Sequence, residues 1–342
     1  MDAGTDAGRD SGMCEPRPFE LERRGAQIMF VIDRSNSMED ALDGSEADPG
    51  ERRWDLVALI LDDVLNDADR LLELGAKFYP RWTPTDPSTP EEACTVAGGI
   101  DIEPARGRTG AILEAFATTY PQGGTPTAEA LRQVREYFAG RPVSAVPRYV
   151  VLATDGGPNC NPDTGVHHTR CLCTGAPDMC LDATYGPYNC IDDRNAYAVI
   201  DELFGALGIP VYVIGIDDPT RPDLADVLDE MAVRGGRPRE VMPGERRFYS
   251  VREPADLRGA FTTITDSISR CVFSVRPTPG AADEVTVRIG DVFVPRDPTR
   301  SEGWDFTSPD RRELTLFGGA CERVAATGDE VIAEVPCPPD EE

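Results

Sequence analysis

The chain has 342 residues, of which 40% are hydrophobic, so it can bury a core and is long enough for one large domain or two smaller ones. It carries 61 acidic and 34 basic residues, a net charge of −27. A field of that sign repels phosphate backbones and anionic lipid surfaces, which argues against a nucleic-acid partner. No stretch of the sequence approaches the ~18 consecutive apolar residues of a membrane span.

The chain opens on a repeat of Asp, Ala or Ser, and Gly over residues 2–12. This composition leaves nothing to bury, which predicts a flexible linker over residues 1–19. Because Met1 is followed directly by the repeat, we expect the chain to begin after a removed targeting segment. The expected location is therefore extracytoplasmic: secreted, periplasmic, or tethered to the outer surface.

Residues 20–271 alternate between apolar strands and amphipathic helices, and this alternation predicts an α/β domain with a doubly wound, mostly parallel sheet flanked by helices. The hydrophobic pattern predicts, in chain order, a strand at 27–33, a helix at 54–68, strands at 73–80 and 98–104, helices at 110–120 and 127–138, a strand at 148–155, a helix at 194–208, a strand at 210–216, a helix at 223–236, a short strand near 247–251 and a helix at 252–271. A cysteine-rich insertion occupies residues 156–193.

The pattern changes after Cys271. Residues 284–295 alternate with period two around Gly290-Asp291, which predicts a β-hairpin. Residues 313–321 and 330–337 also have strand character. We therefore expect residues 272–342 to form a small all-β region.

Three polar clusters lie where predicted strands or loops end. Asp33, Ser35 and Ser37 follow the first strand, Thr125 precedes a helix, and Asp155 ends the strand at 148–155. In doubly wound sheets ligands bind at the carboxyl ends of the strands. Two carboxylates and three hydroxyls are hard oxygen donors, which suit Mg²⁺, Mn²⁺ or Ca²⁺. Each cluster alone is also compatible with simple turn capping.

This set of residues resembles the metal-ion-dependent adhesion site of the von Willebrand factor A (vWA) domain. The pattern DxSxS…T…D is complete, and "GGTPTAEAL" and "TDGGPN" are similar to common wording of that family. The resemblance covers about 250 residues. It implies a Rossmann-like fold, direct ligation by both serines, and a sixth position filled by a partner's carboxylate. Some bacterial members are secreted or surface lipoproteins.

The insertion at 156–193 holds half of the cysteines and both histidines. One hypothesis is a disulfide-stapled loop that also shapes partner recognition, since loops on a rigid scaffold often carry binding residues. Another is a zinc site, although adjacent histidines reach one ion poorly and the cysteine spacing is wrong for zinc. The zinc hypothesis would use His167, His168, Cys171 and Cys173, whereas the candidate partner contacts are Asn36, Met179, Tyr185 and Tyr188.

The ten cysteines are even in number and include no CxxC pair, which predicts disulfides and an oxidising compartment. Their connectivity cannot be deduced from sequence. We expect at least one pair within the C-terminal region, and Cys14 in a disulfide because no apolar run precedes it for lipidation. The candidates are Cys14, Cys94, Cys160, Cys171, Cys173, Cys180, Cys190, Cys271, Cys321 and Cys337.

Three functions remain open at this stage. The first is a divalent-metal-dependent adhesion module at the cell exterior, which captures a protein or an acidic surface polymer. The second is a structural subunit of an extracytoplasmic assembly that acts independently of metal. The third is a metal-assisted hydrolase, which we disfavour because no nucleophile elbow or second base accompanies the site; we predict that the protein is not an enzyme. The acidic loop at 39–51 is expected to be solvated and not a second cation site.

Overall fold

The computed structural model describes residues 16–23, 25–68, 72–142, 146–218, 221–239, 241–242, 244–300, 302–307 and 310–336. The chain divides into two compact units, Gly25–Ser269 and a smaller one made of Met1–Arg24 together with Arg270–Glu342. Strands β1 and β2 near the N-terminus pair with strands that follow residue 270. The sequence predicts a linker over 1–19 and a domain that starts at 20, whereas in the structure residues 17–18 and 20–23 are strands of the smaller unit. Residues 1–15 lie outside the described residues.

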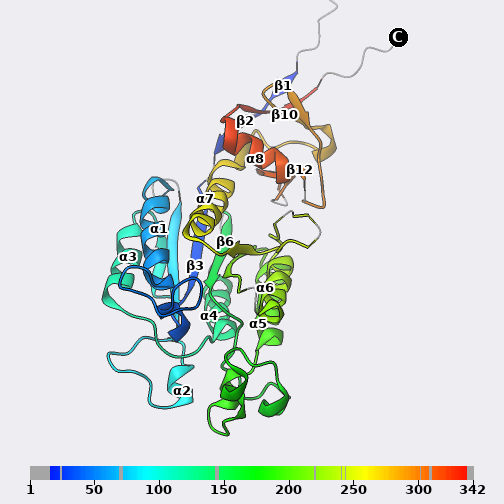
Figure 1. Ribbon diagram of the computed structural model, residues 1–342. Coiled ribbons are helices and arrows are strands. Elements are labelled where there is room, and N and C mark those ends of the chain that lie inside the picture. Colours follow the sequence, from blue (N-terminus) through cyan, green and yellow to red (C-terminus); the bar gives the residue numbers. More distant parts are fainter. Residues whose placement is uncertain are drawn as a thin grey trace, which may run out of the picture. The chain divides into compact units, whose positions relative to one another are not determined.

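The larger unit is built on a six-stranded sheet in the order β5-β4-β3-β6-β7-β8 (Figure 1). All neighbouring pairs are parallel except β4 and β5, which are antiparallel. This confirms the predicted doubly wound, mostly parallel sheet. The strands are β3 (Gln27–Asp33), β4 (Glu73–Tyr79), β5 (Ile102–Ala105), β6 (Arg148–Thr154), β7 (Val211–Ile216) and β8 (Tyr249–Val251).

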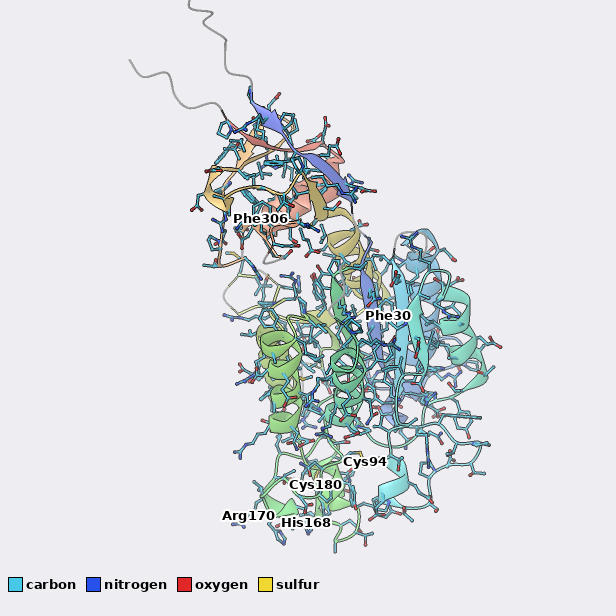
Figure 2. All side chains as sticks on the ribbon, turned by 180° about the vertical axis from the view of Figure 1, so that it is seen from behind. Phe30, Cys94, His168, Arg170, Cys180 and Phe306 are labelled. Carbon is cyan, nitrogen blue, oxygen red and sulfur yellow. A yellow bond between two sulfur atoms is a disulfide. The ribbon has the colours of Figure 1, made fainter. Side chains whose placement is uncertain are left out.

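Helices cover both faces of this sheet, which explains why its central strands are apolar throughout. Ile28, Phe30 and Ile32 of β3 point into one core, whereas Met29 and Val31 point into the other. Figure 2 marks Phe30 in this strand. The first core is closed by α1 (Arg53–Ala68), α3 (Thr109–Thr118) and α7 (Pro254–Arg270), and the second by α4 (Thr127–Ala139), α5 (Asp193–Asp201) with the π-turn Glu202–Ala206, and α6 (Pro222–Arg234).

Short helical turns complete the larger unit, and most of them lie in the loops that follow the strands. They are η1 (Asn36–Glu39), α2 (Pro90–Ala93), η2 (His168–Arg170), η3 (Pro177–Leu181) and η4 (Gly186–Asn189). The last three all belong to the cysteine-rich insertion. That insertion therefore folds as a set of packed single turns instead of extending the sheet.

The smaller unit has two four-stranded antiparallel sheets, in the orders β1-β14-β10-β11 and β12-β13-β9-β2. Its elements are β1 (Arg17–Pro18), β2 (Glu20–Arg23), β9 (Val272–Arg276), η6 (Ala282–Glu284), β10 (Thr286–Ile289), β11 (Val292–Val294), β12 (Gly303–Phe306), β13 (Glu313–Phe317), α8 (Gly318–Thr327) and β14 (Val331–Val335). The predicted hairpin at Gly290-Asp291 is confirmed, because β10 and β11 pair across it.

The expectation of an all-β region is wrong at residues 318–321, where the predicted strand gives way to helix α8. The helix places Val324 in a core with Trp304 and Phe306. Phe306 is labelled in Figure 2. The Cys271–Cys321 disulfide ties this helix to the start of β9. Alanine-rich sequence favours helix, and burial of Val324 together with the disulfide decides the local fold.

Candidate metal centre

Four of the five predicted ligands, Asp33, Ser35, Ser37 and Asp155, come together at the carboxyl ends of the central strands. Asp33 is the last residue of β3, and Asp155 follows the last residue of β6. These two strands are adjacent and parallel, with Ile32 opposite Ala153. The chain leaves β3 toward β4 on one side, while β6 leads to β7 on the other. The two aspartates therefore lie at the point where the winding of the sheet reverses, which is where doubly wound sheets bind ligands.

Asp33 is fully buried and held by two hydrogen bonds. Its Oδ1 accepts from the backbone N–H of Ser35 at 2.8 Å, and its Oδ2 accepts from the hydroxyl of Thr154 at 2.6 Å. Burial, and after it the neighbouring carboxylate of Asp155, raises the pKa of Asp33 to about 7. A divalent cation beside the two carboxylates would offset both of these effects.

The two serines form a continuous line of oxygen atoms to Asp155. The hydroxyls of Ser35 and Ser37 lie 3.2 Å apart, and the Ser37 hydroxyl donates to Oδ1 of Asp155 at 2.9 Å. The Asp155 side chain is fully buried. This donor set fits a hard cation, because carboxylate and hydroxyl oxygens from two strand ends already converge on one small volume.

Thr125, the fifth predicted ligand, is bonded through its backbone to Asn159, in the segment that follows Asp155. Its N–H donates to Oδ1 of Asn159 at 2.7 Å, and its carbonyl accepts from the backbone N–H of Asn159 at 2.9 Å. The Asn159 amide also donates to the Thr174 hydroxyl at 2.9 Å. Asn159, in the segment after β6, therefore connects the Thr125 loop to Thr174 of the insertion. Sequence reasoning missed it, although it stands in the family-like phrase "TDGGPN".

Asn36 performs a similar task from the first loop. Its backbone N–H donates to the carbonyl of Gly123 at 3.0 Å, and its side-chain Oδ1 accepts from the N–H of Gly123 at 3.0 Å. The sequence predicts Asn36 as a partner contact. In the structure its side chain connects the serine loop to the Thr125 loop.

A disulfide lies beside Gly124, the residue before Thr125. Cys94, at the end of α2, is bonded to Cys160. A Cβ atom on Gly124 would lie 2.6 Å from the Cys160 sulfur and 3.3 Å from the Cys94 sulfur. Only glycine therefore fits beside this disulfide, directly before Thr125.

Arg53 is a neighbour of the predicted ligands that the sequence did not indicate. It begins helix α1, and its Nη1 lies 2.7 Å from Oδ2 of Asp155, with both side chains buried. The same guanidinium donates to the carbonyls of Ser37 at 3.1 Å and Ala41 at 2.9 Å. Three partners hold this cation in place. One oxygen of Asp155 therefore faces Arg53, and the other faces Ser37.

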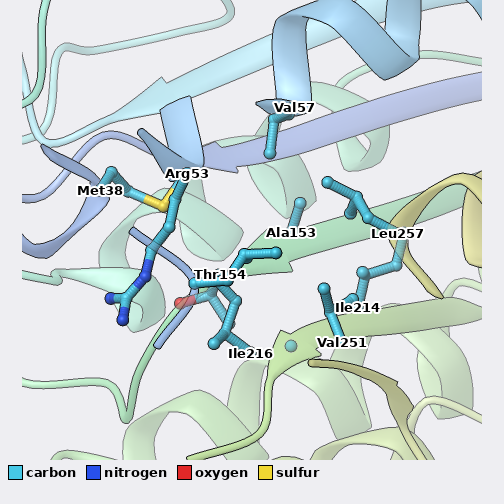
Figure 3. A pocket seen from close by; sticks show the side chains of 11 residues that line it. Met38, Arg53, Val57, Ala153, Thr154, Ile214, Ile216, Val251 and Leu257 are labelled. Carbon is cyan, nitrogen blue, oxygen red and sulfur yellow. The ribbon is translucent and has the colours of Figure 1, made fainter. Parts of the chain in front are cut away.

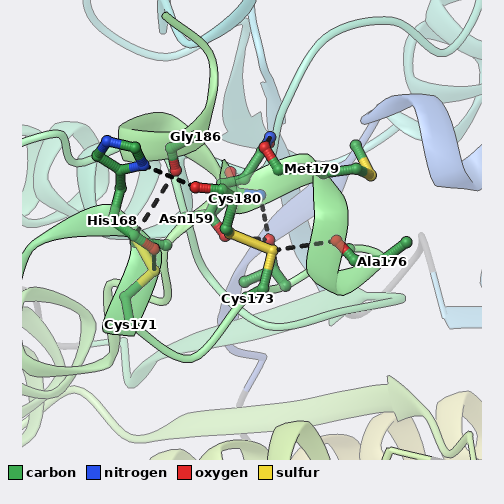
Figure 4. The surroundings of a disulfide bond; sticks show 12 residues. Asn159, His168, Cys171, Cys173, Ala176, Met179, Cys180 and Gly186 are labelled. Atoms are coloured by element: carbon green, nitrogen blue, oxygen red, sulfur yellow. Dashed lines mark hydrogen bonds between the residues drawn. A yellow bond between two sulfur atoms is a disulfide. The ribbon is translucent and has the colours of Figure 1, made fainter. Parts of the chain in front are cut away.

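The zinc hypothesis for the insertion is wrong, because its cysteines are used in disulfides. Cys171 is bonded to Cys190 and Cys173 to Cys180, and these two bonds staple the three short turns together (Figure 4). The rings of His167 and His168 stack with centroids 4.5 Å apart. Nδ1 of His168 lies 2.7 Å from the carbonyl of Cys180. The prediction of a disulfide-stapled loop is confirmed.

Four disulfides are present in the described residues, including the expected pair in the C-terminal region, Cys271–Cys321. Cys14 and Cys337 lie outside the described residues.

The candidate contacts of the insertion have different environments. Met179 and Tyr185 are 48% and 49% exposed, and their neighbour Leu181 is 62% exposed. Tyr188 instead donates its hydroxyl to Oε1 of Glu91 at 2.6 Å, which links the insertion to α2. Met179, Leu181 and Tyr185 therefore lie exposed on the surface of this loop.

Acidic side chains of the loop at 39–51 form local hydrogen bonds and ion pairs. Oδ1 of Asp43 accepts from both the N–H and the hydroxyl of Ser45, and Arg52 pairs with Glu39 and Asp55.

Comparison with known proteins gives structural likenesses only. No protein-family model and no curated protein sequence matches the chain. Among solved structures, it is similar to the PilB minor pilin from Streptococcus sanguinis, with 18% identity and a TM-score of 0.48 over 72% of this chain and 62% of the pilin. It is also similar to the vWF domain of the type V pili tip protein Mfa5 from Porphyromonas gingivalis (13% identity, TM-score 0.41, 72% and 96% covered) and to a von Willebrand factor type A protein from Catenulispora acidiphila (14% identity, TM-score 0.41, 97% and 68% covered). The chain spans less than two thirds of the length of the pilin. No helix in the described parts of the chain is long and apolar enough to cross a membrane.

Proposed function

We propose that this protein is a divalent-metal-dependent binding module that captures a carboxylate of its partner. The observation that carries the proposal is the unbroken line of oxygen donors from Ser35 through Ser37 to Asp155, beside the buried Asp33. Asp33, Ser35, Ser37, Thr125 and Asp155 would hold the ion. Mg²⁺ is the expected ion, with Mn²⁺ and Ca²⁺ as alternatives, because all donors are hard oxygens.

The donor types explain why such a site would bind an outside ligand. Hydroxyl groups are neutral, so a site with few carboxylates leaves the cation short of negative charge. When bound, the ion would supply a Lewis-acidic position for the carboxylate of an acidic side chain or polymer. The chain's own residues orient the donors and exclude water around Asp33. The role is one of binding and not of catalysis.

The partner would be a protein or an acidic surface polymer outside the cytoplasm. The disulfides favour an oxidising compartment, which fits a secreted, periplasmic or surface-lipoprotein location. The exposed Met179, Leu181 and Tyr185 of the insertion would contact the partner's apolar side chains around the carboxylate. The insertion follows Asp155 directly, so it would set partner choice.

The test uses immobilised poly-glutamate as the carboxylate probe, with the full chain in Mg²⁺ or in EDTA. Because the protein carries a net charge of −27, it should bind the probe only in Mg²⁺. Asp33→Ala should abolish this binding, whereas Asp62→Ala, an exposed position on α1, should leave it unchanged. Equal binding by Asp33→Ala and the unsubstituted protein would refute the proposal.

One observation favours a second candidate, a structural subunit that assembles without metal. Strand β11 is the edge of its sheet, and its Val292 and Phe293 are 47% and 60% exposed. Edge strands with apolar side chains readily pair with a strand of another chain. Phe293→Lys should then prevent assembly in EDTA as well as in Mg²⁺, as measured by sedimentation.

A further inference from the structure

Arg53 is an unusual neighbour for a cation site, because it brings a positive charge into contact with a predicted ligand. Its guanidinium lies 2.7 Å from Oδ2 of Asp155, and the two buried side chains form an ion pair. Bonds to the carbonyls of Ser37 and Ala41 fix the arginine on the serine loop itself. Figure 3 shows Arg53 beside Met38 and Thr154 at the end of β6.

The charge balance of the site follows from these contacts. Asp33 and Asp155 contribute two negative charges when both are ionised, and Arg53 cancels one of them. A divalent cation would then leave one net positive charge on the set formed by the ion and these three side chains. Without Arg53, the same ion and carboxylates would be neutral overall. Arg53 therefore adds to the Coulombic attraction that the ion exerts on an incoming carboxylate.

We propose that Arg53 determines ligand preference at this site: it weakens the hold on the divalent cation and preserves the positive charge that attracts a partner's carboxylate. The inference rests on the proposed function. It makes two predictions of opposite sign, because removing the arginine charge should strengthen metal binding and weaken carboxylate binding. A purely structural role for Arg53 would weaken both or neither.

The expected size of the effect follows from Coulomb's law. A unit charge about 5 Å from a divalent ion, even with a water-like dielectric, changes the ion's affinity on the order of tenfold. Arg53→Gln removes the charge and retains a side-chain hydrogen-bond donor. Arg53→Lys retains the charge. Arg52→Gln is the matched control, since Arg52 is adjacent in sequence and pairs with Asp55 and Glu39 instead.

The experiment is isothermal titration of the full chain with Mg²⁺, in chloride and again with acetate replacing chloride at equal ionic strength. We expect Arg53→Gln to bind Mg²⁺ about tenfold more tightly than the unsubstituted protein. Arg53→Lys and Arg52→Gln should stay within about threefold, a margin below the Coulombic change. Acetate should strengthen Mg²⁺ binding to the unsubstituted protein by linkage, and this gain should shrink in Arg53→Gln.

Two results would overturn the inference in different ways. If the unsubstituted protein binds Mg²⁺ and Arg53→Gln binds it equally or less tightly, the role of Arg53 is refuted while the proposed function stands. If the unsubstituted protein binds none of Mg²⁺, Mn²⁺ and Ca²⁺, the proposed function fails and the role of Arg53 falls with it. Should Arg53→Gln not fold, Arg53→Met is titrated in its place and judged by the same Mg²⁺ comparison.

Discussion

Asn159→Ala tests whether the link between Thr125 and the segment after β6 matters for the metal. The substitution removes the acceptor of the Thr125 N–H at 2.7 Å and the donor to the Thr174 hydroxyl at 2.9 Å. Thr174 keeps its bond to the carbonyl of Asn189, so the principal loss is one buried, unpaired N–H. Such a loss costs about 1–3 kcal/mol of unfolding free energy.

The effect on the metal should exceed what this loss of stability explains. Residues that orient metal ligands typically change metal affinity by about 10- to 100-fold when replaced. Asn161→Ala is the matched control, because its amide bonds to Oδ1 of Asp192 at 2.9 Å and it lies two positions away in the same loop. We expect a comparable loss of stability in urea for the two variants.

Mg²⁺ titration should separate the two asparagines, with weakened binding only in Asn159→Ala. If both variants keep the Mg²⁺ affinity of the unsubstituted protein, Asn159 is a stability residue alone and the reasoning about Thr125 is refuted. Amide hydrogen exchange at Thr125 gives an independent check, since its N–H should exchange faster in Asn159→Ala.

Three further predictions concern stability and reactivity. Replacing Cys94 and Cys160 by serine should lower the free energy of unfolding by about 4 kcal/mol, and replacing Cys173 and Cys180 should lower it by about 2 kcal/mol. The difference arises because the two disulfides close loops with sequence separations of 66 and 7 residues. Urea unfolding measures both losses, and equal losses would contradict the loop-length argument. Phe30→Ala should cost about 3–5 kcal/mol because the ring is fully buried against Phe261, whereas Leu59→Ala, at an exposed position, should change unfolding by about 0.5 kcal/mol or less. Lys77, the only lysine, is buried, and its amine donates to the carbonyl of Ala97 at 2.6 Å. An amine-reactive ester should therefore modify Lys77 in urea and not in the native protein, as measured by mass spectrometry. Rapid labelling of Lys77 in the native protein would contradict its burial in strand β4.

The sequence was informative wherever one periodic signal decided the outcome. The apolar run at 27–33 predicted a buried strand, and the structure alternates the residues of this strand between two cores. The same argument predicted β6 and β7 to within one residue at their ends. The sequence predicted that Asp33 and Asp155 both lie at the carboxyl ends of strands, where doubly wound sheets bind ligands. That these two strands are neighbours is a finding of the structure.

Contacts between residues far apart in the chain could not be predicted from the sequence, because they depend on the tertiary fold. The segment at 17–23 has no strong pattern of its own, and its strands exist because β9 and β14 offer unpaired edges. Arg53 gave no signal either, because an arginine at a helix start is ordinary until Asp155 is placed beside it. The pairing of Cys94 with Cys160 likewise depends on the tertiary fold and not on spacing.

The most direct test of the metal centre is an anomalous diffraction map of crystals of the full chain soaked in Mn²⁺. The account predicts a peak within bonding distance of the Ser35 and Ser37 hydroxyls, beside Asp155 and Thr125, and the loss of that peak in Asp33→Ala crystals. A map with no Mn²⁺ peak at these residues, or with the same peak in Asp33→Ala, would contradict the central claim.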